Sequence, residues 1–257
     1  MYADFNLRFK GHSLNPLNYA PEYLIVPDKL TFNAFVTLGY MRKNIFIIIH
    51  PSLKKIREKS LNFPKEAIKI KRKKLLNNYD KGTEIWMFAG EVLSQDKRLH
   101  KDRSYQISGR GNSKHRIHII LEELLEVRNR KKPKPLIILR PHPKNEKNDF
   151  KEYFKEIDYI SKNPDPIEDI LCSDLIVGSS TIFLMEAHYA GKPTLSIMTK
   201  KGEEVWCPSV LNGLTPAAFT AKEIEQELDI YKFRKLKINQ IQNKVSIMSI
   251  IKKVKSN

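Results

Sequence analysis

Short apolar runs alternate with helix-like patterns from residue 84 onward, and this alternation limits the possible folds of the 257-residue chain more than any other feature. Runs that suit buried strands cover residues 85–89, 135–139, 158–160, 175–177 and 194–197, and helical patterns cover residues 113–128, 167–171, 182–190 and 221–228. Strands that alternate with helices indicate a parallel sheet with helices on both faces. We therefore predict an α/β fold with a Rossmann-like parallel sheet.

The N-terminal part of the chain shows the same alternation of strand-like and helix-like runs, but with fewer of them. Residues 23–26 and 45–49 suit strands on either side of a helix at residues 31–38. Asp80-Lys81-Gly82 supplies turn chemistry, which favours a boundary after residue 78. We expect residues 1–78 to form a partial N-terminal α/β segment, residues 79–220 the Rossmann-like domain, and residues 221–257 a basic C-terminal helical segment.

The composition favours a cytoplasmic protein that binds anions. Hydrophobic residues make up 41% of the chain, enough for a core, and the longest apolar run, residues 45–49, is far shorter than the roughly 18–20 residues that cross a bilayer. The start MYADFNLRFK lacks the layout of a signal peptide, and Cys172 and Cys207 have no disulfide or metal-ligand spacing. The net charge of +17 favours nucleic acid, an acidic membrane or a phosphorylated ligand, although a bias toward lysine explains it equally well.

The segment LRPHP places a guanidinium, Arg140, and an imidazole, His142, directly after a predicted strand. Ligands of open α/β sheets bind in the crevice outside the carboxyl ends of the strands. A guanidinium there pairs with phosphate oxygens through two parallel hydrogen bonds. The alternative is that Pro141 and Pro143 only end the strand and that His142 is a solvated loop residue.

A second segment, Val177-Gly178-Ser179-Ser180-Thr181, runs from a predicted strand into a predicted helix. Gly178 permits a tight turn and the close approach of a ligand, and the hydroxyl groups and free amides at the start of the helix suit an anion. Ordinary capping of the helix by Ser or Thr is the alternative. Glu186, about one turn further along, suits acceptance of hydrogen bonds from ribose hydroxyls, or is a plain surface residue.

Other motifs exclude several chemistries. Neither a Walker loop nor GxGxxG is present, and the GRGN at residues 109–112 follows no predicted strand. His115 and His118 are spaced three apart on a helical pattern, but no further ligands match them, so a solvated helix face is favoured over a metal site. We expect neither a cofactor nor a metal. Glu91, just after the strand at residues 85–89, is a candidate acid or base facing the cleft.

RPHP followed by IEDILCSDLIVGSSTIFLMEAHYAGKP resembles the C-terminal, donor-binding domain of GT-B glycosyltransferases. The His-Pro and Ser-Ser motifs look like those of bacterial sialyltransferases and Kdo transferases, in which both motifs hold a CMP-sugar donor. The resemblance implies that His142, Ser179 and Ser180 bind the donor phosphate and that Glu186 binds the ribose. The resemblance covers roughly residues 84–200 and implies that the domain at residues 79–220 binds a nucleotide-sugar donor, CMP-, CDP- or UDP-linked, for surface polysaccharide synthesis. The residue chemistry described above adds Arg140, Gly178 and Thr181 to this site.

The chain departs from that family in its N-terminal part. Ile49-His50-Pro51 stands where the family often has a Gly-Asn-Pro-like turn, and the Asp/Glu-Asp-Gly motif of bacterial sialyltransferases is missing. Most of the acceptor-binding domain is expected to be absent. The resemblance therefore implies glycosyl transfer only if a complete acceptor domain belongs to the same protein or to a partner chain.

Two other functions remain open. A UDP-sugar 2-epimerase shares the two-domain fold and a similar run of small residues, Glu-Ala and Gly-x-Pro. A non-catalytic basic module would bind nucleotide, RNA or an anionic membrane through the lysines at residues 65–74 and 232–255. Sparse aromatic residues in these clusters argue against nucleic acid. Isoleucine and valine between the lysines of the tail suit a peripheral position at the inner membrane.

Overall fold

The computed structural model describes residues 5–93, 104–113, 115–146, 148–234, 236, 248 and 250–252. Contacts divide the chain into two compact units, one formed by residues 1–55 with 238–257 and the other by residues 56–237. Among the described residues, no helix has both the length and the apolar character needed to cross a membrane.

The small unit contains a parallel pair of strands and a helix. Its elements are α1 (Phe5–Arg8), β1 (Leu24–Val26), α2 (Lys29–Thr37), a 3-10 helix η1 (Arg42–Asn44) and β2 (Ile45–Ile47). The Asp28 carboxylate caps α2 by accepting a hydrogen bond of 2.7 Å from the Thr31 amide. Val26, Phe35 and Ile45 are buried together, so α2 packs on the strand pair as the N-terminal pattern predicts.

The large unit is built on a parallel sheet, which confirms the predicted α/β fold. Its strands are β3 (Ile85–Ala89), β4 (Leu136–Arg140), β5 (Tyr159–Ile160), β6 (Leu175–Gly178), β7 (Thr194–Ile197) and β8 (Ala217–Ala218). Within the described residues they form one six-stranded sheet in the order β5-β4-β3-β6-β7-β8. Every pairing in it is parallel, so the carboxyl ends of β4, β3 and β6 are neighbours at one edge.

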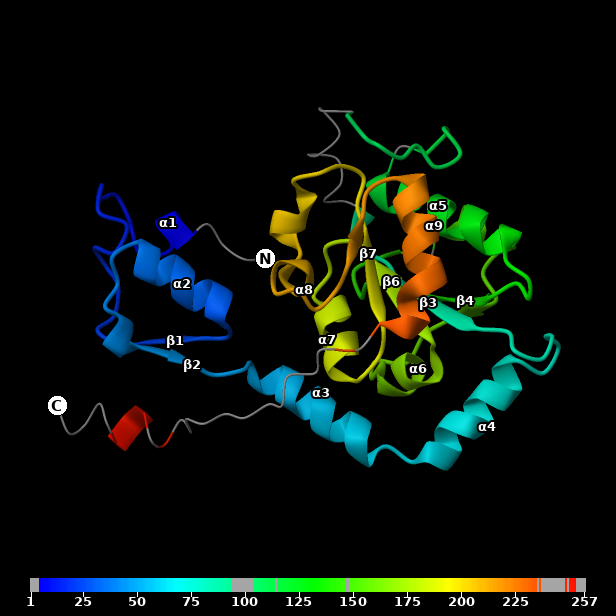
Figure 1. The fold of residues 1–257 in the computed structure, drawn as a ribbon, viewed down its shortest axis with the longest axis horizontal. Coiled ribbons are helices and arrows are strands. Elements are labelled where there is room, and N and C mark those ends of the chain that lie inside the picture. The colour runs from blue at the N-terminus through cyan, green and yellow to red at the C-terminus, as the bar shows by residue number, and fades with distance from the viewer. Residues whose placement is uncertain are drawn as a thin grey trace. The chain divides into compact units, whose positions relative to one another are not determined.

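Helices cover both faces of this sheet (Figure 1). They are α3 (Pro51–Asn62), α4 (Lys65–Leu75), α5 (Arg116–Arg130), α6 (Ile167–Cys172), α7 (Phe183–Tyr189), α8 (Pro208–Leu211) and α9 (Ala221–Ile230), with 3-10 helices η3 (Lys151–Tyr153), η4 (Glu203–Trp206) and η5 (Tyr231–Phe233). α5 and α9 pack on one face, and α4, α6 and α7 pack on the other.

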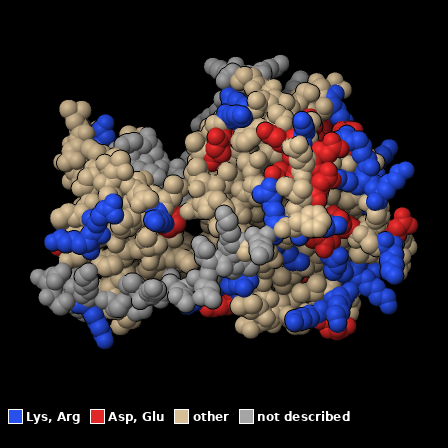
Figure 2. Space-filling model, in the orientation of Figure 1, with Lys and Arg blue, Asp and Glu red and all other residues tan. Residues whose placement is uncertain are grey.

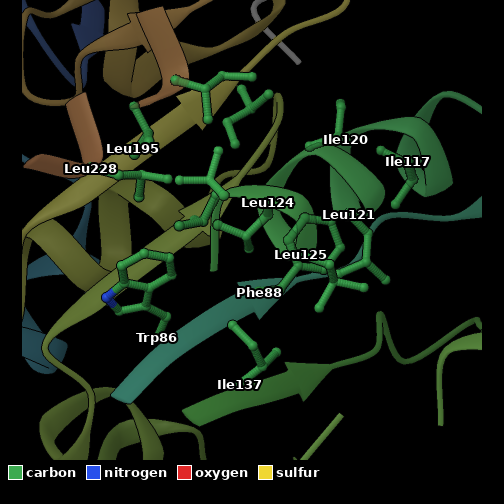
Figure 3. Close-up of a cluster of buried hydrophobic side chains, with 14 of the residues drawn as sticks. Trp86, Phe88, Ile117, Ile120, Leu121, Leu124, Leu125, Ile137, Leu195 and Leu228 are labelled. Carbon is green, nitrogen blue, oxygen red and sulfur yellow. The ribbon is translucent and has the colours of Figure 1, made fainter. Parts of the chain in front are cut away.

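Side chains of β3 alternate between the two faces, because successive residues of a strand point to opposite sides. Trp86 and Phe88 join the core under α5, whereas Ile85 and Met87 join the core on the opposite face. Figure 3 shows the first of these cores, with Leu121, Leu124 and Leu125 of α5 close to Phe88. Since both faces of β3 are buried, the strand is an unbroken apolar run.

The unit boundaries differ from the predicted boundaries at residues 78 and 220. Residues from Ile56 onward belong to the large unit because Ile56, Ile68 and Leu75 pack against the core beneath the sheet. At the other end, Ile224 and Leu228 of α9 are buried in the core on the α5 face. The basic tail beyond residue 237 lies almost entirely outside the described residues.

The GRGN segment at residues 109–112 is bound to α5 by a hydrogen bond and an ion pair. Gly109 has a φ of +57°, and its amide donates a hydrogen bond of 2.9 Å to Glu123. The Arg110 guanidinium pairs with Glu126 at 2.9 Å and with Glu156 at 2.7 Å. These contacts hold the segment against α5 and join it to Glu156.

Candidate functional site

Three loops that carry the predicted site residues meet at the carboxyl edge of the sheet. Glu91 follows β3, His142 follows β4, and the turn at residues 179–181 follows β6. Asn145 joins two of these loops: its Oδ1 accepts a hydrogen bond of 2.7 Å from the His142 amide, and its Nδ2 donates one of 3.1 Å to the Glu91 carbonyl. Neighbouring parallel strands therefore bring together residues that lie up to 90 positions apart in the sequence.

Arg116, which no sequence pattern singled out, lies between these loops. It is the first residue of α5 and only 3% exposed. Its Nη1 donates to Ser179 Oγ at 2.6 Å, and its Nη2 donates to Glu91 Oε2 at 3.0 Å. A second carboxylate, that of Glu203, lies 3.5 Å from Nη1. Sequence reasoning missed Arg116 because the spacing of α5 marks its position only as part of a buried helix.

The Glu91 carboxylate is held entirely by protein groups. Besides the ion pair with Arg116, its Oε1 accepts a hydrogen bond of 2.6 Å from the Ser180 amide, and its Oε2 lies 3.1 Å from Ser180 Oγ. The carboxylate thus sits where the turn after β6 would receive an anion. Glu91 thus connects Arg116 to the Ser180 amide, and its acid or base role stays a prediction.

The serines of the turn also contact the protein itself. Ser179 is 1% exposed, its Oγ accepts from Arg116, and its carbonyl accepts a hydrogen bond of 2.6 Å from Ser196 Oγ. Gly178 is required by close packing inside the protein: a Cβ there would lie 3.0 Å from Thr181 Cγ2 and 3.5 Å from Ala89 Cβ. The glycine therefore makes room for protein atoms.

Thr181 is half-buried, and its Oγ1 accepts a hydrogen bond of 3.2 Å from the Phe183 amide. Because that contact uses the oxygen as an acceptor, the hydroxyl hydrogen remains able to donate. The Thr181 hydroxyl can thus donate a hydrogen bond to a ligand that binds at the turn.

Arg140 is the last residue of β4, and hydrogen bonds and an aromatic ring hold its guanidinium in place. Its Nη1 donates to Ser161 Oγ at 2.8 Å and to the Asn163 carbonyl at 2.9 Å, and its guanidinium lies 5.6 Å from the ring centre of Phe183. Burial lowers the pKa of Arg140, while the charges of Asp169, Glu186 and Asp165 oppose that shift. The guanidinium is therefore fixed beside the first turn of α7, near Glu186.

His142 is half-buried, and its ring orientation is set by a backbone contact. The Lys144 amide donates a hydrogen bond of 3.1 Å to Nδ1. Since Nδ1 acts as the acceptor, the neutral ring carries its proton on Nε2. Nε2 is then the donor of this imidazole.

Glu186 lies on α7, and its carboxylate makes no hydrogen bond or ion pair with the residues that the structure describes. Burial raises the pKa of Glu186, and the positive charge of Arg140 opposes that shift. A half-buried carboxylate without an internal donor is unusual, because burial of a charge without a partner is costly. Glu186 is the predicted site residue with an unused acceptor.

The histidine pair on α5 is not on a solvated helix face, which corrects that part of the prediction. His118 is 5% exposed, its Nε2 lies 2.8 Å from the Asp149 carbonyl, and its ring packs on Tyr153. In the described part of the chain, no group of three or more His, Cys, Asp or Glu side chains is placed to hold a metal ion. A pocket of about 380 Å³ lies beside the pair, lined by Leu93, Asn112, Ser113, His115, His118, Asn148, Asp149 and Glu152.

No protein-family model matches the chain, and no curated protein matches it in sequence. Solved structures do match. The UDP-GlcNAc 2-epimerase of Methanocaldococcus jannaschii, in complex with UDP-GlcNAc and UDP, is 17% identical with a TM-score of 0.56 over 92% of this chain and 61% of that chain. The Neisseria meningitidis UDP-GlcNAc 2-epimerase bound to UDP-GlcNAc is 12% identical with a TM-score of 0.54 over 92% of this chain and 61% of that chain. The wall teichoic acid polymerase TagF is 15% identical with a TM-score of 0.48 over 82% of this chain and 49% of that chain.

The likeness to the two epimerases shows the fold. It supports the GT-B-like, Rossmann-like architecture that the motifs led us to expect. The chain spans between half and about three fifths of the length of these solved structures. The finer resemblance to sialyltransferase and Kdo-transferase motifs stays a prediction.

Proposed function

We propose that the large unit binds a nucleotide-activated sugar, or a comparable activated polyol, at the carboxyl edge of β4, β3 and β6. In this proposal the protein is glycosyltransferase-like and serves surface polysaccharide synthesis with a CMP-, CDP- or UDP-linked donor. The observation that carries it is that Arg140, a fixed cation, lies near Glu186, a carboxylate that lacks a hydrogen-bond donor within the described residues. A nucleotide offers the complementary groups, namely anionic phosphate and ribose hydroxyls.

The phosphate side of the proposal rests on three donors. Arg140 supplies positive charge, His142 supplies the Nε2 hydrogen, and Thr181 supplies a hydroxyl. Charge-assisted hydrogen bonds to phosphate are stronger than neutral ones, and fixed donors lose little entropy when a ligand arrives. In a transfer reaction, the same donors would stabilise the charge that builds on the leaving phosphate.

The ribose side of the proposal rests on Glu186. A carboxylate accepts hydrogen bonds from two vicinal hydroxyl groups without reorganisation. Because the carboxylate is half-buried and near Arg140, a ribose there would supply the donors that the protein does not. A site built to bind hydroxyl groups rejects an analogue that lacks them.

The test compares CMP and UDP with their 2′,3′-dideoxy analogues by calorimetry. We expect the wild type to bind the ribonucleotide at least about tenfold more tightly than the dideoxy analogue. Glu186→Ala should remove that preference and leave the affinity for the analogue nearly unchanged. Glu225→Gln, on the exposed side of α9, is the matched control and should keep the preference. An unchanged preference in Glu186→Ala would remove Glu186 from the ribose site.

A nucleotide panel separates the proposed donors. We expect cytidine nucleotides to raise the melting temperature more than adenine or guanine nucleotides do, since binding to the folded state alone adds about 2.7 kcal/mol at a hundredfold excess over the dissociation constant. A uridine preference would favour a UDP-linked donor or the epimerase alternative, which the fold likeness to two UDP-GlcNAc 2-epimerases motivates. Conversion of UDP-GlcNAc to its 2-epimer without an acceptor would establish that alternative. No response to any pyrimidine nucleotide would contradict nucleotide binding.

A second candidate function, attachment to an anionic membrane, rests on the exposed face of α4. Figure 2 shows Lys and Arg side chains gathered over this helix. The exposed residues are Lys65, Lys69, Lys73 and Lys74, and Ile70 among them is 63% exposed. Basic helices with an exposed apolar residue suit the surface of anionic lipid bilayers. This attachment would accompany nucleotide binding.

A further inference from the structure

The guanidinium of Arg116 organises the candidate site from inside the protein. Arg116 begins α5, and its side chain is 4% exposed. Nη1 reaches Ser179 Oγ at 2.6 Å, and Nη2 reaches Ser180 Oγ at 3.4 Å. One buried planar group therefore contacts both serines of the turn after β6.

Among the described residues, the carboxylates of Glu91 and Glu203 contact this guanidinium. Glu91 Oε2 lies 3.0 Å from Nη2, and Glu203 Oε2 lies 3.5 Å from Nη1. Glu203 is itself anchored, because it accepts hydrogen bonds of 2.8 Å from both the amide and the Oγ1 of Thr199. Arg116 thus lies between a buried acceptor in η4 and the loop after β3.

The Glu91 carboxylate connects the Arg116 guanidinium to the turn after β6. Its Oε1 accepts a hydrogen bond of 2.6 Å from the Ser180 amide, while its Oε2 binds Arg116. The orientation of the Ser180 peptide, and with it the position of Thr181, therefore depends on the guanidinium. A lysine cannot reproduce this arrangement, because an ammonium is a point donor without the rigid planar fork of arginine.

We propose that Arg116 is a positioning residue of the anion site, which holds Glu91 and the Ser179–Ser180 turn so that Thr181 meets a ligand phosphate. This proposal rests on the proposed function, since it assigns Arg116 to that same site. Arg116 acts through Glu91 and the turn and is too deeply buried to contact the ligand. Removal of its fork should therefore weaken binding of the phosphate part of a ligand and leave binding of the nucleoside part intact.

The chain offers a matched control on the same helix. Arg128 is also 3% exposed, and it donates to the Pro135 carbonyl at 2.7 Å and to the Glu156 carbonyl at 2.9 Å. It also pairs with Asp158. All of its partners lie away from the loops after β3 and β6, so Arg128→Lys should impair packing to a similar extent without affecting the anion site.

The experiment measures the dissociation constants of CDP and cytidine for the wild type, Arg116→Lys and Arg128→Lys, together with the amide NMR signal of Ser180. We expect Arg116→Lys to weaken CDP binding about tenfold or more, as for the loss of one charge-assisted hydrogen bond, and to change cytidine binding less than about twofold. The Ser180 signal should shift in Arg116→Lys and stay in place in Arg128→Lys. Glu203→Gln, which weakens the anchor of Arg116, should give a smaller change of the same kind.

Three results would overturn the role of Arg116. They are an unchanged affinity for CDP, an equal loss for CDP and cytidine, and an equal effect of Arg128→Lys. If the wild type binds neither CDP nor UDP, the proposed function fails, and the Ser180 signal alone decides the positioning role. An unshifted signal in Arg116→Lys would then contradict it. If Arg116→Lys does not fold, the same comparisons apply to Glu203→Gln.

Discussion

At the scale of single residues, Gly109 shows how a glycine serves packing where no ligand motif exists. Its φ is +57°, and a Cβ at this position would lie 2.2 Å from Glu122 Oε2. We expect Gly109→Ala to lower the free energy of unfolding by about 2–4 kcal/mol, since it adds steric overlap to backbone strain. Urea denaturation measures the loss. Gly111→Ala is the control. Gly111 has a φ of +82°, but a Cβ there would have no atom within 4 Å, so this variant should lose only the free energy of the backbone strain.

The buried His118 predicts a dependence of stability on pH. Burial lowers the pKa of His118 below its usual 6.5, although the charges of Glu152 and Glu122 oppose that shift and that of His115 adds to it. Below pH 6.5 the unfolded chain therefore binds a proton at His118 that the folded protein does not. The contribution of neutral His118 to the free energy of unfolding is complete above pH 6.5 and is lost as the pH falls below that value. We expect the stability of His118→Gln to fall less steeply than that of the wild type between about pH 6.5 and 5, in urea titrations. Parallel slopes would contradict the lowered pKa.

At the scale of elements, an ion pair at the amino edge of the sheet ties α4 to β6 and β3. Arg72 donates to both oxygens of Asp174 at 3.0 Å, and Asp174 Oδ2 also accepts a hydrogen bond of 2.8 Å from the Ile85 amide. Both side chains are less than one third exposed. We expect Asp174→Ala to destabilise the protein by about 1–3 kcal/mol in urea denaturation, since it leaves the Ile85 amide without its acceptor and Arg72 with the Cys172 carbonyl but no carboxylate. Lys69→Gln on the same helix breaks an exposed pair with Glu66 and should cost less than about 0.5 kcal/mol.

At the scale of the whole molecule, the net charge of +17 predicts salt-dependent binding to anionic surfaces. Replacement of the α4 lysines Lys65, Lys69, Lys73 and Lys74 by Gln should weaken binding to phosphatidylglycerol vesicles at least about tenfold, since each lysine near such a surface contributes on the order of 1 kcal/mol. Vesicle co-sedimentation measures the change. A control with the same change in charge replaces four exposed lysines elsewhere, namely Lys132, Lys134, Lys155 and Lys162. An equal loss in both variants would assign the binding to net charge alone, and nucleotide affinity should be unchanged in both.

The sequence by itself determined the fold class of the large unit and most of its elements, although no pattern predicted α3, α8 or β8. The apolar runs at β3, β4 and β6 are dictated by burial on both faces of the sheet, and burial leaves a signal in consecutive residues. The same local logic placed Glu91, His142 and Ser180 at one edge, because neighbouring parallel strands all end on the same side. Position along a strand is therefore readable without a structure.

Only the tertiary structure decided which groups contact one another at that edge. Arg116 meets Glu91, Ser179 and Glu203 across separations of 25, 63 and 87 residues, and no local pattern encodes such pairs. The unit boundaries depended on tertiary contacts as well, since α9, which we grouped with the basic tail that follows it, buries Ile224 in the core of the large unit. Hydrogen bonds act over about 3 Å in space, whereas periodicity reports only whether a residue is buried.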